Sequence, residues 1–99
     1  MDIIQTQNDE VAILKLTGRL DTVTAPKLQD ALTEVISKAV DLELDFAGVD
    51  YASSAGLRVL LLGHKNTQAA GKTMTLKNVS SEVMEIFDVT GFSGILNIL

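Results

Sequence analysis

The chain has 99 residues, the size of one domain, and we expect residues 1–99 to form that domain. It contains no cysteine, which excludes a disulfide framework and a thiolate metal or redox site. Its formal charge of −5 comes from 13 acidic and 8 basic residues, and no basic stripe suggests a nucleic-acid partner; a protein partner is favoured.

The N-terminal third is predicted to form a β-hairpin followed by a helix. Residues 3–6 and 11–17 are rich in β-branched and aliphatic side chains, as strands are, and Gly18 is expected to end the second strand. Thr24 is placed to cap a helix whose first turn accommodates Pro26. Apolar residues then recur at spacings of three and four, which indicates one face of a helix: Leu28, Ala31, Leu32, Val35, Ile36 and Ala39.

The middle of the chain is predicted to form a strand, a loop and a second helix. Apolar and acidic residues alternate over 41–46, the pattern of a strand with one buried face. Residues 47–52 are expected to be a loop, after which Ser53-Ser54-Ala55-Gly56 opens a helix that Gly71 ends. One side of this helix carries Leu57, Leu60, Leu61 and His64.

The C-terminal third is predicted to contain a short strand over 73–76 and a helix capped by Ser80 and ended by Gly91. The inner side of this helix carries Val83, Ile86, Phe87 and Thr90. Residues 95–99 could add an edge strand. The resulting order, β-β-α-β-α-β-α-(β), predicts an α/β fold with an opening β-hairpin, three main helices and a mixed, mostly parallel sheet.

Functional residues are expected at one edge of this sheet, because the carboxyl ends of parallel strands meet there and sites gather on the loops that follow. Three loops qualify, and they carry Gly18, Arg19, Asp21 and Thr22; Asp50, Tyr51, Ser53 and Ser54; and Asn78, Val79 and Ser80. We therefore expect Asp21, Ser54 and Asn78 to lie at the same edge.

No enzyme motif fits these residues. The only histidine, His64, lies about ten residues inside the second helix, roughly 15 Å along its axis from Ser54 and too far for a catalytic triad. The sequence contains no phosphate-binding loop, dinucleotide fingerprint or metal-ligand spacing. We expect no catalytic residue, cofactor or metal; a small nucleotide-binding or nucleotide-hydrolysing domain is the enzymatic alternative.

Residues 44–60 resemble the STAS signature, in which a hydrophobic strand and a short loop lead to (Asp/Ser)-(Ser/Thr)-x-Gly-Leu at a helix start. Gly18-Arg19-Leu20-Asp21 matches the family's Gly-x-(Leu/Ile)-Asp, and Phe87 to Phe92 resembles its Phe-x-x-x-Gly-(Phe/Leu). Gly71 and Asn78 also fall at familiar positions. Over essentially its whole length the chain is similar to the STAS-domain anti-sigma factor antagonists, which are bacterial partner-switching regulators.

This resemblance implies a phosphorylation switch. Such antagonists, when unphosphorylated, bind an anti-sigma factor that is also a serine kinase and thereby free the sigma factor. The kinase modifies the serine before x-Gly-Leu, and a metal-dependent serine phosphatase restores it. That serine is Ser54 here. Ser53 stands where sporulation-type antagonists carry aspartate, which makes it a rival acceptor.

The same resemblance predicts the partner-binding residues, namely Asp21, Thr22, Ser53, Ser54, Gly56, Leu57, Arg58 and Asn78. Four of the polar residues have a simpler interpretation: Ser54 as a helix cap, Asp21 as an acceptor for loop amides, Asn78 as a loop-shaping residue, and Arg58, like Lys65, as a solvated charge. The second functional hypothesis is a STAS subunit that docks on the ATPase of a lipid-transport ABC complex.

The N-terminal residues lack the basic and apolar regions of a secretory signal. No apolar run approaches the roughly 18 to 20 residues that a membrane-spanning helix needs. We therefore expect a cytoplasmic monomer without membrane insertion.

Overall fold

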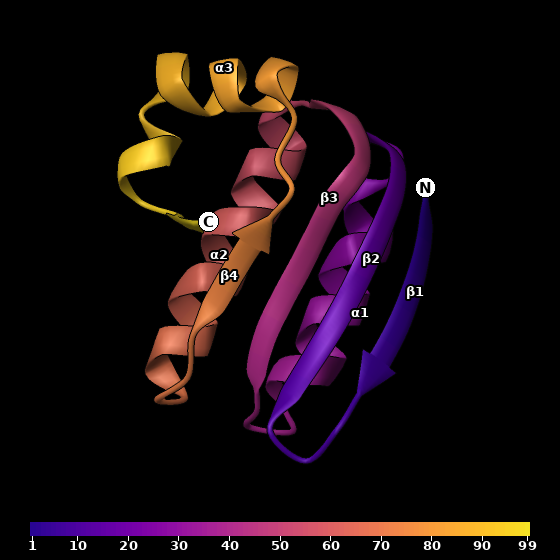
Figure 1. Ribbon diagram of the computed structural model, residues 1–99, viewed down its shortest axis with the longest axis vertical. Coiled ribbons are helices and arrows are strands. Elements are labelled where there is room, and N and C mark those ends of the chain that lie inside the picture. Colours follow the sequence, from indigo (N-terminus) through magenta and orange to yellow (C-terminus); the bar gives the residue numbers. More distant parts are fainter.

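A computed structural model describes residues 1–99 as one five-stranded sheet with α1 and α2 behind it (Figure 1). The order of elements matches the predicted order, with one short 3-10 helix added. The elements are β1 (Asp2–Gln7), β2 (Val11–Leu20), α1 (Ala25–Ile36), β3 (Asp41–Ala52), α2 (Ser54–Ala69), β4 (Met74–Lys77), α3 (Ser81–Thr90), η1 (Phe92–Gly94) and β5 (Asn97–Ile98).

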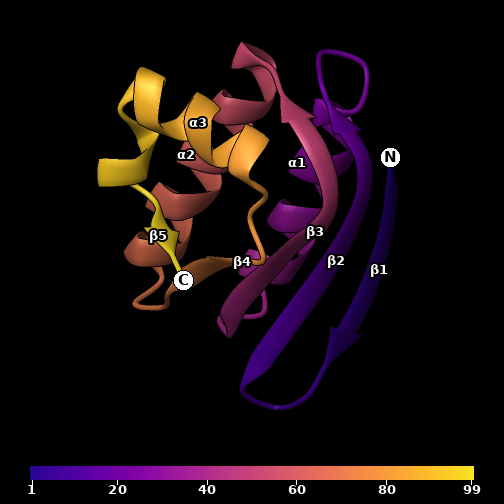
Figure 2. The ribbon, with the colours of Figure 1, turned by 45° about the horizontal axis from the view of Figure 1, so that its top comes forward.

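The strands lie in chain order, β1-β2-β3-β4-β5. β1 pairs antiparallel with β2, and every other pair is parallel, which confirms the mixed, mostly parallel sheet. Because both central crossovers run in the same direction across the sheet, α1 and α2 cover the same face. α3 lies beyond the end of β4, beside the second half of β3 (Figure 2).

The core lies between the sheet and the helices. The predicted apolar faces are largely buried, with Leu28 and Val35 of α1 and Leu60 of α2 fully enclosed. Thr90, predicted on the inner side of α3, is exposed. Phe46 of β3 and Phe87 of α3 meet edge to face, with ring centroids 6.3 Å apart and an interplanar angle of 61°, so α3 is anchored on the sheet. None of the helices combines the length and the hydropathy that crossing a bilayer requires.

β3 is twice as long as predicted, and the loop expected over 47–52 is strand. Its buried positions are Leu42, Leu44 and Phe46, then Val49, then Ala52. Each break in the alternation accompanies a register shift against β2, where β3 carries one extra residue. Such bulges interrupt the period-two pattern without ending the strand. For the same reason Gly18 does not end β2: it stays in the strand with φ +110°, a conformation that favours glycine.

Helix α1 differs from the prediction in its N-terminal cap and in its last residue. Thr24 precedes α1 as expected, but its side chain makes no capping hydrogen bond to the helix. α1 also ends at Ile36, so Ala39 is not on its apolar face but in the turn that follows, with φ +53°. Gly91, with φ +82°, ends α3 as predicted.

Candidate functional site

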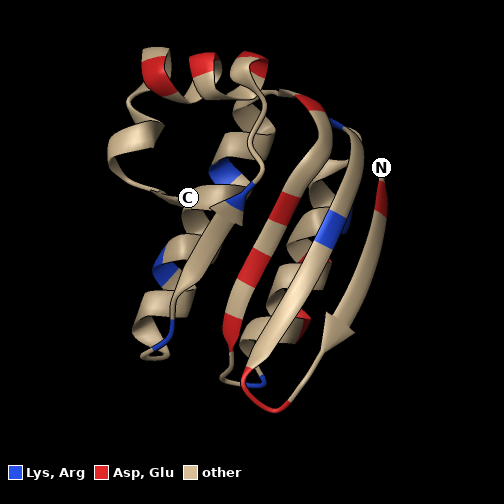
Figure 3. Cartoon of the chain, in the orientation of Figure 1, with Lys and Arg blue, Asp and Glu red and all other residues tan.

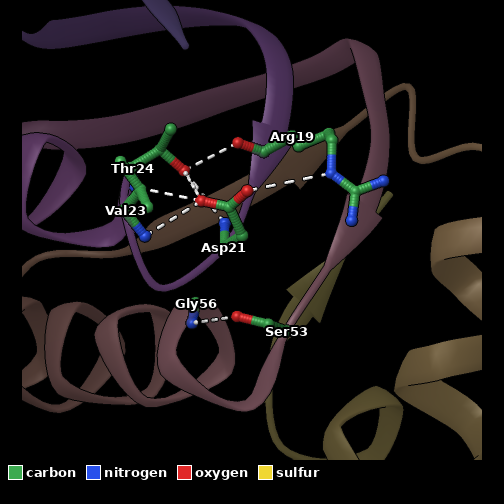
Figure 4. A network of polar contacts seen from close by, with 6 residues as sticks. All are labelled: Arg19, Asp21, Val23, Thr24, Ser53 and Gly56. Carbon is green, nitrogen blue, oxygen red and sulfur yellow. Dashed lines mark hydrogen bonds and ion pairs between the residues drawn. The ribbon is translucent and has the colours of Figure 1, made fainter.

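The predicted site forms where β2 and β3 end side by side. Leu20 is paired with Ala52, and the Ser53 amide donates a hydrogen bond of 2.8 Å to the Leu20 carbonyl. The loop after β2 therefore lies beside the start of α2. Figure 4 shows Asp21 next to Ser53 at this edge, with the Asp21 carboxylate directed toward its own loop and the Ser53 hydroxyl toward Gly56. We call this place the β2–β3 rim: residues 19–24 and 51–58.

The start of α2 assigns different roles to its two serines. Ser53 is extended, with φ −87° and ψ 174°, and its Oγ accepts the Gly56 amide at 3.5 Å. Ser53 is therefore the N-cap, and the interpretation of Ser54 as the cap is wrong. Ser54 is the first helical residue, and it is exposed. A hydroxyl at this position is free for other chemistry.

Gly56 is required by the close approach of α2 to the end of β2. A Cβ atom at this position would lie 2.5 Å from Leu20 Cγ and 3.1 Å from the Leu20 carbonyl oxygen. Leu20 is itself fully buried, so it has little room to move away. The glycine of the signature thus lets the start of α2 sit against the strand that carries Asp21.

Asp21 organises the loop after β2. Its Oδ1 accepts the amides of Val23 and Thr24 at 3.0 and 3.1 Å, while the Thr24 hydroxyl accepts the Asp21 amide at 2.9 Å. The Thr24 amide, the Thr24 hydroxyl, the Val23 amide and Arg19 favour the carboxylate and outweigh desolvation, so the pKa of Asp21 lies below its ordinary value. The proposed role of Asp21 in satisfying loop amides is confirmed.

Arg19 and Tyr51 form a contact that the sequence did not indicate. The Arg19 guanidinium carbon lies 4.2 Å from the centroid of the Tyr51 ring, within range of a cation–π interaction. Arg19 Nε is also 3.7 Å from Asp21 Oδ2. The sequence predicts both residues in loops, but they lie in the last residues of β2 and β3, and their contact depends on the pairing of these strand ends.

A hollow of about 160 Å³ opens between the starts of α1 and α2. We call it the α1–α2 groove; its lining residues are Thr22, Ala25, Pro26, Gln29, Ala55, Arg58 and Val59. Of these residues, the sequence predicts only Thr22 and Arg58 to bind a partner. Next to the groove Val23 exposes 86% of its surface, and an apolar residue in a short polar loop is the signal that could have indicated it.

Three predicted contact residues do not contribute to the surface of this rim. Gly56 and Leu57 are buried inside the domain, so they position α2. Asn78 follows Lys77, which is paired with Asp45 of β3. This part of β3 lies roughly 20 Å along the strand from Ala52, where the rim begins. The expectation that Asn78 joins Asp21 and Ser54 is wrong, because β4 is much shorter than β3.

Asn78 has a local structural role instead. Its φ is +58°, and its Nδ2 donates to Asp45 Oδ1 at 3.1 Å. The Ala47 amide and then Asn78 stabilise the carboxylate, so the pKa of Asp45 also lies below its ordinary value. Asn78 therefore shapes the turn between β4 and α3.

The remaining polar candidates do not assemble into a reaction centre. His64 is half-buried in α2, and its Nδ1 is buried without a hydrogen-bond partner. No group of three or more His, Cys, Asp or Glu side chains is arranged to hold a metal ion. What the β2–β3 rim offers is an exposed serine, a carboxylate ordered by loop amides and an adjoining groove.

Comparison with known proteins assigns the fold to a family. The family model described as "Mlab, STAS domain" matches residues 3–98. The anti-sigma-B factor antagonist of Bacillus subtilis (strain 168) is 30% identical over 98 residues, which cover 99% of this chain and 88% of that protein.

Solved structures agree in fold. An anti-sigma factor antagonist from Mycobacterium paratuberculosis superposes with a TM-score of 0.86 at 20% identity, over 98% of this chain and 83% of that one. The unphosphorylated form of SpoIIAA gives 0.83 at 19% identity, over 99% and 88%. Its phosphorylated form gives 0.75 at 16% identity, over 99% and 91%.

Proposed function

This chain belongs to the STAS domain family, and from that premise we propose that it is an anti-sigma factor antagonist that binds an anti-sigma factor through the β2–β3 rim. The proposal rests chiefly on one observation: Ser54 is exposed at the start of α2, between Ser53, which is hydrogen-bonded to the end of β2, and Ala55, which lines the α1–α2 groove. Binding, rather than catalysis, is its activity in this proposal.

The relatives favour this function over the alternative of an ABC-transporter subunit. The Bacillus protein matches over almost the full length of both chains and is named for antagonism of an anti-sigma factor. Copurification with a nucleotide-binding transporter subunit, in place of an anti-sigma factor, would support the alternative.

We further propose Ser54, rather than Ser53, as the phosphate acceptor. Ser54 is exposed, whereas Ser53 is half-buried and its oxygen is engaged as the N-cap. A kinase active site must surround the attacking hydroxyl, which is easier for an exposed side chain. In the reaction, Ser54 Oγ bonds to the γ-phosphorus of ATP, the hydroxyl proton passes to a base of the kinase, and ADP leaves.

The phosphate would act on the contact surface and leave the fold intact. It adds a charge of roughly −1.5 to −2 at a helix N-terminus, where the free amides and the helix dipole tolerate an anion. The carboxylate of Asp21 on the neighbouring loop already has Arg19 at 3.7 Å, so the phosphate itself would supply the added negative charge at the rim. An anti-sigma factor that had packed on this surface would then have to bury a doubly charged group, which is costly.

The test uses an anti-sigma factor with serine kinase activity and the full chain. Ser54→Ala should bind it with wild-type affinity and should remain bound when ATP is added, while wild-type protein is released. Ser54→Asp should bind at least tenfold more weakly with an unchanged circular dichroism spectrum. Intact-mass analysis after ATP should show one phosphate on wild-type protein and on Ser53→Ala, and none on Ser54→Ala.

Ser81→Ala is the matched control, since Ser81 is also an exposed serine at the first position of a helix. It should bind and be phosphorylated as wild type is. Phosphate on the Ser54→Ala variant would transfer the switch to another residue, and absence of binding by wild-type protein would reject the proposed function itself.

A further inference from the structure

Arg58 is a charged residue of the β2–β3 rim that no other side chain holds. It lies in the second turn of α2, is exposed, and lines the α1–α2 groove. It makes no ion pair and donates no hydrogen bond, whereas Arg19, Lys38 and Lys77 are each paired with a carboxylate. A free guanidinium on a chain of net charge −5 is available to an anionic group.

Ser54 and Arg58 are four residues apart on the same helix. Side chains at this spacing are neighbours, with Cβ atoms about 5 to 6 Å apart, and an anion N-terminal to a cation is the favourable order. α2 contains no acidic residue that could compete, and its only other lysine or arginine, Lys65, is eleven positions from Ser54. A phosphate on Ser54 would therefore find Arg58 as its nearest cation along the helix.

We infer that Arg58 carries the effect of Ser54 phosphorylation into the α1–α2 groove. In the unmodified chain its guanidinium is free in the groove to receive an acidic side chain of the anti-sigma factor. In the modified chain the phosphate at position 54 captures it, so the groove loses its cation while the rim gains an anion. This inference rests on the proposed function, because it assigns a role within the same switch.

The geometry makes the capture local and reversible. An arginine fork can donate two parallel hydrogen bonds to phosphate oxygens, and such charge-assisted bonds are roughly twice as strong as neutral ones. Only the Arg58 side chain has to turn, since its Cα is fixed by a helix whose neighbouring residues Leu57 and Val59 are buried. Dephosphorylation returns the guanidinium to the groove without any change in the backbone.

The first experiment measures the pairing without an anti-sigma factor or kinase. Phosphoserine is incorporated genetically at position 54 of the full chain, and the second ionisation of the phosphate is followed by ³¹P NMR. Arg58→Gln should raise the titration midpoint by roughly 0.3 to 0.7 pH unit, because a neighbouring cation favours the dianion. Lys65→Gln is the matched control: it removes the same charge from α2, about two turns further along, and should leave the midpoint unchanged.

The second experiment measures the role in the groove. Arg58→Gln in the unmodified chain should weaken binding to the anti-sigma factor about fivefold and reduce its dependence on salt, whereas Lys65→Gln should change the affinity less than twofold. Equal titration midpoints for Arg58→Gln and Lys65→Gln, or wild-type affinity of Arg58→Gln, would overturn the inference. Failure of the proposed function would look different, because the wild-type chain would then not bind the anti-sigma factor at all.

Discussion

Two helices of this domain begin with the same local motif in opposite electrostatic surroundings. α2 starts at Ser53-Ser54 and α3 at Ser80-Ser81; in each the first serine is extended and caps the helix while the second is exposed. α2 carries two basic residues and no acidic one, whereas α3 carries three acidic residues and no basic one (Figure 3). The same Ser-Ser helix start therefore presents its exposed serine in two different electrostatic surroundings.

The surroundings differ at matched positions. Four residues after the exposed serine stands Arg58 in α2 and Glu85 in α3. Three residues after the cap stands Gly56 in α2, pressed against Leu20, and buried Val83 in α3. α2 thus begins in close contact with the end of β2 and has an arginine one turn away, while α3 begins with a buried valine and exposed acidic side chains.

The largest loss of stability should come from Gly56→Ala, which gives α2 a side chain at the position where α3 has Val83. The new methyl group would meet Leu20 Cγ at 2.5 Å, and we expect a loss of about 1 to 2 kcal/mol in the free energy of unfolding. This value already includes the roughly 1 kcal/mol by which alanine favours a helix over glycine. Urea unfolding followed by circular dichroism measures it.

Gly94→Ala is the control for this change, because a Cβ atom there has no neighbour within 4 Å. It should alter stability by less than about 0.5 kcal/mol. Equal stability of the Gly56 and Gly94 variants would mean that α2 does not depend on its close contact with Leu20.

The next largest loss of stability should come from removing the two cap side chains, and it should differ between them. Ser80 Oγ accepts the Val83 amide at 3.2 Å, whereas Ser53 Oγ accepts the Gly56 amide at 3.5 Å, close to the limit for a hydrogen bond. We expect Ser80→Ala to cost about 1 kcal/mol and Ser53→Ala about 0.5 kcal/mol. Thermal unfolding of both variants checks this order, with Ser81→Ala, a change at an exposed serine, as reference. A larger loss of stability for Ser53→Ala than for Ser80→Ala would contradict the expectation that the longer hydrogen bond is the weaker cap.

Much of this comparison could be predicted from the sequence, because it depends on local patterns. The order of strands and helices, the cap at Ser80 and the stop at Gly91 follow from periodicity and from residues with specific backbone preferences. The position of Ser54 and Arg58 on one helix follows in the same way.

The remaining features depend on strand pairing, which the sequence does not encode locally. Two bulges shift the buried positions of β3 after Phe46, so that the alternation stops and a strand resembles a loop. Beyond the bulges β3 continues to Ala52, and Ser53 is left as the cap of α2. The unequal lengths of β3 and β4 separate Asn78 from the rim, and no pattern within either segment indicates this difference.

The last comparison is of phosphoserine at the two helix starts. Both positions have the same helix dipole, so a difference between them isolates the side chains nearby. At position 54 the phosphate has Arg58 one turn away, whereas at position 81 it has Glu82 next to it and Glu85 one turn away. We expect phosphoserine 81 to be less favourable than phosphoserine 54 by about 1 kcal/mol, since pairs at this spacing change sign with their charges.

The measurement is the change in melting temperature when each serine is replaced by genetically encoded phosphoserine. Glu85→Arg should remove most of the penalty at position 81, because it gives α3 the cation that α2 has at the same spacing. Arg58→Glu should create a comparable penalty at position 54. If both charge reversals leave the melting temperatures of the two phosphorylated chains unchanged, the helix amides alone accommodate the phosphate. The contrast between α2 and α3 then lies in the groove and the loop next to the start of α2, and not in the charges along the helices.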